Sequence, residues 1–160
     1  MRMAVEFLER AITDVFWELN WGARKKVNHL ILIPTGDGYA IGFDPSMHDY
    51  RILEYVAKLH VELRRDLEIR MGIHKGPNVI HVDLNDHLNM MGFGISYAQR
   101  VMGLAKTHQM LCSSDFAKPL KMERHIPELI EIGEREIKHG DKILVYNYYR
   151  EGVFGVAENP

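Results

Sequence analysis

Hydrophobic and polar positions repeat along this chain with two periods, one typical of helices and one typical of strands. Apolar residues at helical spacing predict three helices, over residues 3–20, from about 49 to 65, and over 92–106. Shorter apolar or alternating runs predict strands at residues 30–33, 39–43, 68–74, 79–84, 109–113, 131–138 and 143–149. A further short helix is expected over residues 115–125, broken at Pro119 because proline lacks the backbone N–H.

Turn sequences indicate how these strands are connected. Gly36-Asp37-Gly38 predicts a tight hairpin between the first two strands, since glycine adopts positive φ at little steric cost. We expect residues 75–78 to close a second hairpin between 68–74 and 79–84, and residues 139–141 to close the last one. Residues 85–89 are interpreted as a polar loop. Helices interleaved with hairpin-connected strands predict an α+β fold with a mixed sheet.

Length and composition are those of an ordinary globular domain. The chain has 160 residues, of which 46% are hydrophobic and 26% charged, enough to build one core. We expect a single domain over residues 1–150 and a loose tail over 151–160. A formal net charge of −2 gives no general electrostatic argument for binding nucleic acid or a membrane surface. The lone Cys112 excludes an intrachain disulfide, and the absence of an apolar run of transmembrane length favours a cytoplasmic protein.

Asp37 is the first candidate functional residue. The hairpin turn places its carboxylate at the tip of two strands. An aspartate beside glycine is commonly only a turn former. A carboxylate at a strand end also holds Mg²⁺ while the ion keeps phosphate ligands from a substrate. The turn by itself leaves both interpretations open.

The predicted helix over residues 92–106 carries the second candidate. Most of its positions are apolar, and the remaining narrow stripe consists of Gly92, Ser96, Arg100 and Gly103. The two glycines cost helix stability, which suggests that something approaches this stripe closely. Arg100 then either packs its stem and solvates its head, or binds an anion with its planar guanidinium. The helix alone favours neither.

Three ordered segments resemble the catalytic domain of class III nucleotidyl cyclases. Residues 70–77 are similar to that family's R-x-G-I-H-x-G strand, and residues 92–101 to its G-x-x-V-N-x-A-x-R helix. Residues 35–38 resemble its metal-binding hairpin. Bacterial cyclases of the antiphage cyclic-pyrimidine type are more similar still. They share Pro-Thr-Gly-Asp-Gly, an Asp-x-Asn loop like residues 83–85, and Ala-Gln-Arg-Val-Met like residues 98–102.

The resemblance implies a ferredoxin-like cyclase sandwich and a defined reaction. A nucleoside triphosphate is converted to a 3′,5′-cyclic nucleotide and pyrophosphate for intracellular signalling, with Mg²⁺ or Mn²⁺ as cofactor. Asp37 matches a metal ligand, and Arg100 matches the arginine that stabilises the transition state. Ser96 falls at the ribose-orienting position, and Gly36 and Gly38 flank the nucleotide. The family forms homodimers in which each composite site combines the metal half of one subunit with the arginine half of the other.

Departures from the family pattern predict weak or absent catalysis. Ser96 replaces an asparagine, and the base-selecting lysine and acid of purine cyclases fall at Ile33 and Asn89. The first metal carboxylate should lie on a strand before the first helix, where this sequence has none. Asp44 or Asp83 would then have to supply a second ligand. The alternative function is a non-catalytic relative that binds nucleotide or dimerises.

Two further expectations concern three histidines and the edge of the strand at residues 30–33. His74, His81 and His87 are interpreted as ordinary surface or edge histidines rather than as a metal cluster. Without the first strand, the strand at 30–33 would expose an edge, which residues 152–156, a partner or an upstream segment should cover.

Overall fold

The computed structural model describes residues 2–19 and 30–158 of the chain. The helices in this part are α1 (Arg2–Glu18), α2 (Asp49–Leu63), α3 (Phe93–Gly103) and α4 (Ser114–Glu123), with a 3₁₀ turn at Lys138–Gly140. The strands are β1 (Leu30–Pro34), β2 (Tyr39–Phe43), β3 (Met71–Ile73), β4 (Val79–Val82), β5 (Leu88–Met91), β6 (Met110–Ser113), β7 (Leu129–Glu136) and β8 (Lys142–Tyr148). None of the described helices combines the length and apolar character needed to cross a bilayer.

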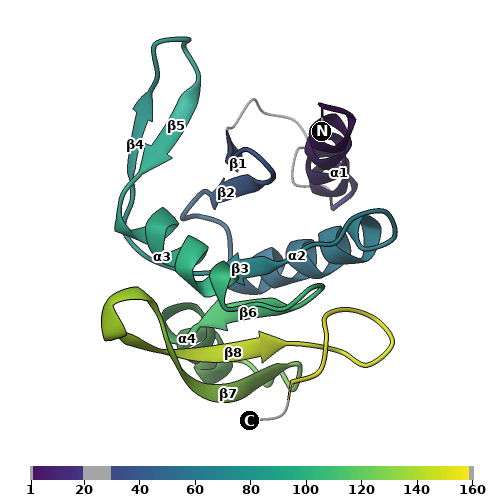
Figure 1. Ribbon diagram of the computed structural model, residues 1–160, viewed down its shortest axis with the longest axis vertical. Coiled ribbons are helices and arrows are strands. Elements are labelled where there is room, and N and C mark those ends of the chain that lie inside the picture. Colours follow the sequence, from purple (N-terminus) through teal and green to yellow (C-terminus); the bar gives the residue numbers. More distant parts are fainter. Residues whose placement is uncertain (1, 20–29, 159–160) are drawn as a thin grey trace.

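A four-stranded sheet in the order β3-β6-β8-β7 forms the centre of the molecule (Figure 1). β3 and β6 run parallel, with Gly72 opposite Leu111, whereas the other pairs are antiparallel. The hairpins β1–β2 and β4–β5 form two separate small sheets. The expected α+β fold with a mixed sheet is therefore confirmed.

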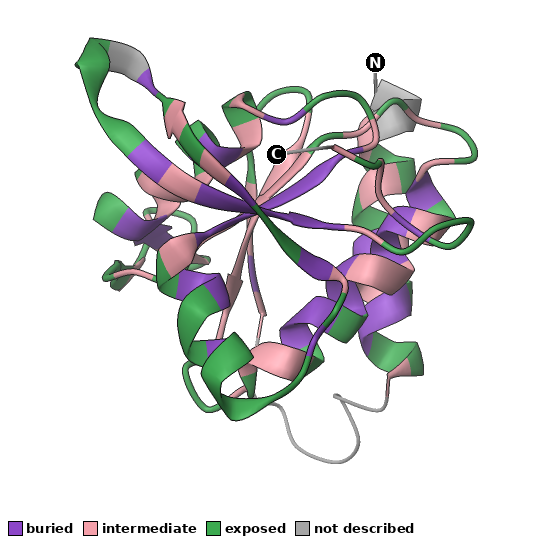
Figure 2. Ribbon diagram, turned by 90° about the horizontal axis from the view of Figure 1, so that it is seen from below, coloured by how far each residue is buried: buried purple, intermediate pink, exposed green. Residues whose placement is uncertain are grey.

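The two faces of the central sheet bury different sets of side chains. One face presents Met110, Cys112, Tyr146 and Tyr148, and they share a core cluster with residues of α1, α2 and α4. The other face presents Leu111, Ile143 and Val145, which share a second cluster with Val101 of α3 and Ala105 just after it. Alternate strand residues point to opposite faces, so α3 lies alone across the sheet from the other three helices. Buried positions accordingly line the strands and the inner sides of the helices in Figure 2.

The β1–β2 hairpin forms as its turn sequence predicts. Leu32 lies opposite Ile41 and Pro34 opposite Tyr39 in an antiparallel ladder. The backbone N–H of Thr35 donates to the Gly38 carbonyl at 2.9 Å and closes the turn. Gly36 has φ of +96°, a conformation that glycine adopts without strain.

The expected hairpin between residues 68–74 and 79–84 is wrong. β3 pairs with β6, and β4 pairs with β5, a strand that begins inside residues 85–89, the region interpreted as a polar loop. Met90 of β5 is buried and packs beside Gly42, while Asn89 points to the other face. β5 is short and only Met90 is buried in it, so its sequence carries little of the alternation that predicts a strand.

One expectation about helices, the break at Pro119, is wrong. α4 continues through Pro119 because the proline lies on the exposed side, while Phe116, Ala117 and Leu120 anchor the opposite side in the core. α2 begins after His48, whose Nδ1 accepts from the Tyr50 backbone N–H at 3.2 Å. The end of the first helix expected at residue 20 lies outside the described residues.

The segment after Arg150 folds back onto the domain, although we expected a loose tail. Arg150 and Phe154 form an antiparallel bridge, and the Phe154 ring is buried against Tyr148 with 4.5 Å between ring centroids. Residues 152–156 therefore cover part of the central sheet and do not pair with β1, the strand edge that we expected them to cover. A buried aromatic ring offsets much of the entropy lost in ordering the segment.

Candidate functional site

The β1–β2 hairpin brings together four of the sequence-predicted site residues. Asp37 is exposed at the turn between Gly36 and Gly38, and Ile33 lies in β1 opposite Ala40, partly exposed. The turn is closed by a backbone hydrogen bond, so the Asp37 carboxylate stands on a defined scaffold facing solvent. This arrangement lets it contact a ligand or a second protein chain.

α3 presents the other pair, Ser96 and Arg100, one helical turn apart on its exposed side. The Ser96 hydroxyl donates to the Gly92 carbonyl at 3.2 Å within the first turn of the helix. Within residues 2–19 and 30–158, no hydrogen bond or salt bridge engages the Arg100 guanidinium. An exposed arginine in this state can offer its full planar set of donors to an anion.

Close approach to α3 occurs on a different side from the one expected. A Cβ at Gly72 of β3 would lie 2.3 Å from the Met102 backbone nitrogen and 2.7 Å from the Ala98 carbonyl oxygen. Nothing lies within 4 Å of a Cβ at Gly103. Phe93 is 60% exposed, so the helix is also less buried than its apolar composition suggested. The tightest approach is thus at Gly72 in the sheet, although a Cβ at Gly92, at the start of the stripe, would also lie 3.2 Å from the Asn78 Cα. Ser96 and Arg100 of the stripe face solvent.

The N-terminus of α3 is closed by the loop between β3 and β4. The Asn78 side-chain oxygen accepts from the Ile95 backbone N–H at 2.9 Å, and the Pro77 carbonyl accepts from Gly94 N–H at the same distance. These bonds satisfy two backbone donors that a helix start leaves without partners. The sequence placed Asn78 only in a turn, because a cap supplied from 17 positions away leaves no local signal.

His74 is enclosed beneath α3 and is not the surface histidine we expected. Its side chain is 2% exposed, and its Nδ1 lies 2.8 Å from the Ser113 hydroxyl and 3.9 Å from an Asp115 carboxylate oxygen. Its ring lies 4.5 Å from the Tyr97 ring, centroid to centroid. Burial lowers the pKa of His74, which the Asp115 charge partly opposes. The uncharged His74 ring, directly after β3, therefore contacts Ser113 of β6 and Tyr97 of α3.

Asn89 and Asp83 lie on the β4–β5 hairpin, which extends away from the body of the molecule (Figure 1). The Asn89 side-chain oxygen accepts from the next backbone N–H, that of Met90, at 2.8 Å. One Asp83 oxygen accepts from the backbone N–H groups of Asn85 and His87 at 2.8 and 3.0 Å. These bonds lower the pKa of Asp83 and show that its carboxylate shapes the hairpin loop.

The described residues do not form a complete metal site around Asp37. Within them, no group of three or more histidine, cysteine, aspartate or glutamate side chains is arranged to hold an ion. Asp44 follows the opposite end of β2, five residues and about 17 Å along the strand from the turn. Asp83 is committed to its own loop. A single carboxylate does not fit the two-ion arrangement that the family resemblance implied, and Asp37 alone would hold Mg²⁺ or Mn²⁺ weakly.

Comparison with solved structures gives a consistent result. The chain superimposes on the guanylate cyclase domain of RhGC from Catenaria anguillulae, solved in complex with GTP, with a TM-score of 0.66, 18% identity, and coverage of 92% of this chain and 83% of that one. It matches an adenylate cyclase from Trypanosoma brucei in its monomeric state, with a TM-score of 0.74, 14% identity, and coverage of 98% and 82%. For the adenylyl cyclase CyaB from P. aeruginosa the TM-score is 0.58 and the identity 16%, with coverage of 94% of this chain and 87% of that one.

No family model and no curated protein matches this sequence. The likeness therefore lies in the fold: the chain has the α+β, ferredoxin-like architecture of class III adenylyl and guanylyl cyclase catalytic domains. At identities of 14–18% the fold is shared although most residues differ, so the likeness does not assign a role to any single residue.

Proposed function

We propose that this chain is a nucleotidyl-cyclase-type domain whose ligand is a nucleoside triphosphate. The observation that carries the proposal is the exposed Arg100 guanidinium on a cyclase-fold helix, with no ion-pair partner among the described residues. The triphosphate is an anion that matches its planar donors. In the proposed reaction the ribose 3′-hydroxyl attacks the α-phosphorus, a 3′,5′-cyclic nucleotide forms and pyrophosphate leaves.

The proposed site is shared between two copies of the chain. Asp37 and Arg100 lie on separate elements, and among the described residues no hydrogen bond or salt bridge joins the β1–β2 turn to α3. A two-fold dimer that places the turn of one copy against α3 of the other would assemble both halves twice. In that arrangement Ser96 faces the ribose, and Ile33 and Asn89 face the base.

We further propose that the chain by itself turns over slowly. Charge stabilisation by bound ions is a main source of rate in this chemistry, and Asp37 is the sole carboxylate assigned to the ions. Mg²⁺ or Mn²⁺ would be held mainly by the phosphates of the substrate.

The second candidate is a non-catalytic cyclase-like domain that binds nucleotide or dimerises. The specific observation in its favour is the incomplete metal site, together with a serine at position 96 that is shorter than the family's asparagine. Such a domain would keep the Arg100 contact to phosphate and lose the chemical step.

Incubation of the protein with Mn²⁺ and each of the four ribonucleoside triphosphates separates the two candidates. A cyclic product detected by mass spectrometry, and lost in both Asp37→Ala and Arg100→Ala, supports a cyclase. Binding of a triphosphate without product, weakened by Arg100→Ala and not by the control Arg51→Ala on α2, supports the non-catalytic domain. The absence of both binding and product would reject the cyclase and the nucleotide-binding domain, and would leave a domain that only dimerises, which sedimentation would test.

A further inference from the structure

Two buried amide side chains lie where the central sheet meets the end of the chain. Gln109, just before β6, and Asn147 of β8 are both 0% exposed. The Gln109 Nε2 donates to Asn147 Oδ1 at 3.2 Å, and Gln109 Oε1 accepts from the Lys106 backbone N–H at 2.9 Å. Buried amides need partners for their remaining donors, since an unpaired one costs roughly 1–3 kcal/mol.

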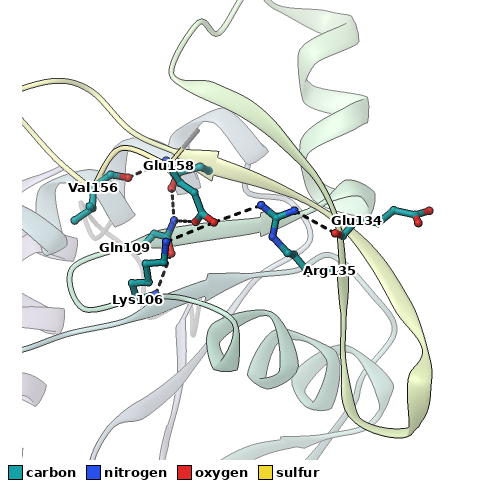
Figure 3. Close-up of polar contacts among 7 residues, drawn as sticks. Lys106, Gln109, Glu134, Arg135, Val156 and Glu158 are labelled. Carbon is teal, nitrogen blue, oxygen red and sulfur yellow. Dashed lines mark hydrogen bonds and ion pairs between the residues drawn. The ribbon is translucent and has the colours of Figure 1, made fainter. Parts of the chain in front are cut away.

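The C-terminal segment supplies those partners (Figure 3). The Asn147 Nδ2 donates to the Val156 carbonyl at 2.8 Å. Two residues later, the Glu158 carboxylate accepts from Gln109 Nε2. The same carboxylate lies 3.4 Å from an Arg135 guanidinium nitrogen and 3.7 Å from the Lys106 ammonium. One backbone carbonyl and one carboxylate are thus bound by four side chains, two from the segment between α3 and β6 and one each from β7 and β8.

The receiving surface is built for a carboxylate. The Glu158 side chain is 16% exposed, so its charge is largely removed from water and compensated by two cations and an amide donor. The hydrogen bond from Gln109 lowers the pKa of Glu158, and the positive charges of Arg135 and Lys106 contribute. Within the described residues, no other carboxylate forms a salt bridge with Arg135 or Lys106. Without the segment, Arg135 and Lys106 would lose their carboxylate partner, and Gln109 and Asn147 would each lose one acceptor for an amide N–H.

A sterically constrained turn directs the segment onto this surface. Phe154 anchors it against Tyr148, and Gly155 then reverses direction with φ of +72°. A Cβ at Gly155 would lie 2.5 Å from the Tyr148 carbonyl oxygen. Gly152 has a similar φ of +67°, but nothing lies within 4 Å of a Cβ there. The two glycines therefore differ only in whether a side chain would push the segment off the sheet.

We propose that the surface formed by Lys106, Gln109, Arg135 and Asn147 is a binding site for an extended acidic peptide, and that residues 154–158 are its intramolecular ligand. The site recognises a backbone carbonyl followed two residues later by a carboxylate. When the segment is released, the same chemistry accepts residues 154–158 of a second copy of this chain in trans. The inference does not depend on the proposed cyclase activity.

The test uses the full-length chain and a fluorescein-labelled peptide with the sequence of residues 151–158. Gly155→Ala should displace the segment, so we expect this variant to bind the peptide at least tenfold more tightly than the wild type. The matched control Gly152→Ala should bind like the wild type. A peptide carrying Glu158→Gln should bind at least tenfold more weakly. Equal peptide binding by all three chains, or no binding to Gly155→Ala, would overturn the proposal.

Two further measurements keep the test decisive if Gly155→Ala folds poorly. Full-length Glu158→Gln should bind the wild-type peptide more tightly than the wild-type chain does, and its residues 154–158 should exchange amide hydrogens at least tenfold faster. Unchanged amide exchange would contradict a role for Glu158 in holding residues 154–158 on the sheet. Competition identifies the source: displacement by an unrelated acidic peptide of the same spacing indicates a general acidic-peptide site, whereas displacement by the tail peptide alone indicates a second copy of this chain.

Discussion

The Nδ1 of His74 lies 2.8 Å from the Ser113 hydroxyl, across the parallel pair of β3 and β6. Both side chains are almost completely buried, so neither can exchange this partner for water. We expect Ser113→Ala to lower the free energy of unfolding by about 1–3 kcal/mol, because it leaves a buried ring nitrogen without a hydrogen-bond partner. Urea denaturation measures this. The exposed control Ser46→Ala should change stability by less than about 0.5 kcal/mol, and equal effects of both would contradict this role.

Stability should decline as the pH falls below 6.5, the ordinary pKa of histidine. Burial lowers the pKa of both His60 and His74 in the folded protein. The unfolded chain then binds more protons than the folded chain between the lowered values and 6.5, so protonation favours unfolding. The lowered pKa of Glu158 affects stability only below pH 4.5, its ordinary value, so it does not contribute to the decline between pH 7.5 and 5. Urea midpoints between pH 7.5 and 5 should show the decline, and His74→Gln should reduce its slope.

Gly72→Ala should disrupt the packing of α3 on the sheet. The added methyl group would meet the α3 backbone at 2.3 Å, and a backbone cannot move aside as a flexible side chain can. We expect a loss of about 3 kcal/mol of stability. The matched substitution Gly103→Ala meets nothing within 4 Å and should be neutral or stabilise by up to about 1 kcal/mol. Similar thermal melting of the two variants would show that the close approach at Gly72 is not energetically important.

If the wild type forms a cyclic product, Asp37→Ala and Arg100→Ala should each abolish it. Mixing the two variants should restore up to about a quarter of the wild-type rate, because half of the dimers are mixed and each holds one intact site. Product formation after mixing, with dimers verified by sedimentation, measures the recovery. Both residues are exposed, so each single variant should fold like the wild type. Mixed dimers without activity would reject a site shared between subunits.

Nucleotide binding should show no strong purine preference. Ile33 offers no hydrogen bond where purine cyclases have a lysine, and Asn89 replaces an acid that would reinforce the choice. We expect UTP and CTP to bind at least as tightly as ATP and GTP in titration calorimetry. ATP bound tenfold more tightly than the pyrimidine nucleotides, a difference of about 1.4 kcal/mol, would contradict this assignment of the base-facing residues.

Local signals along the chain were sufficient for the features that depend on neighbouring residues. Helical periodicity located α1, α2 and α3, and the Gly36-Asp37-Gly38 turn located the β1–β2 hairpin with Asp37 at its tip. Such features depend on turn geometry and on burial of one helix face, and both are determined by residues a few positions apart in the sequence. Exposure of the Ser96 and Arg100 stripe followed from the same periodicity.

Contacts between distant residues were decided only by the tertiary structure. β3 pairs with β6 across 39 positions rather than with the adjacent β4, and α3 packs closely against β3 at Gly72. Asn78 caps α3 from another loop, and Glu158 reaches Gln109 across 49 positions. The composition of residues 151–158 resembles a loose tail, and only the buried amides of Gln109 and Asn147 give that segment a place to bind. A strand can pair with several others, and a polar side chain can hydrogen-bond to many groups. Which pair forms depends on which residues are buried together in the folded protein.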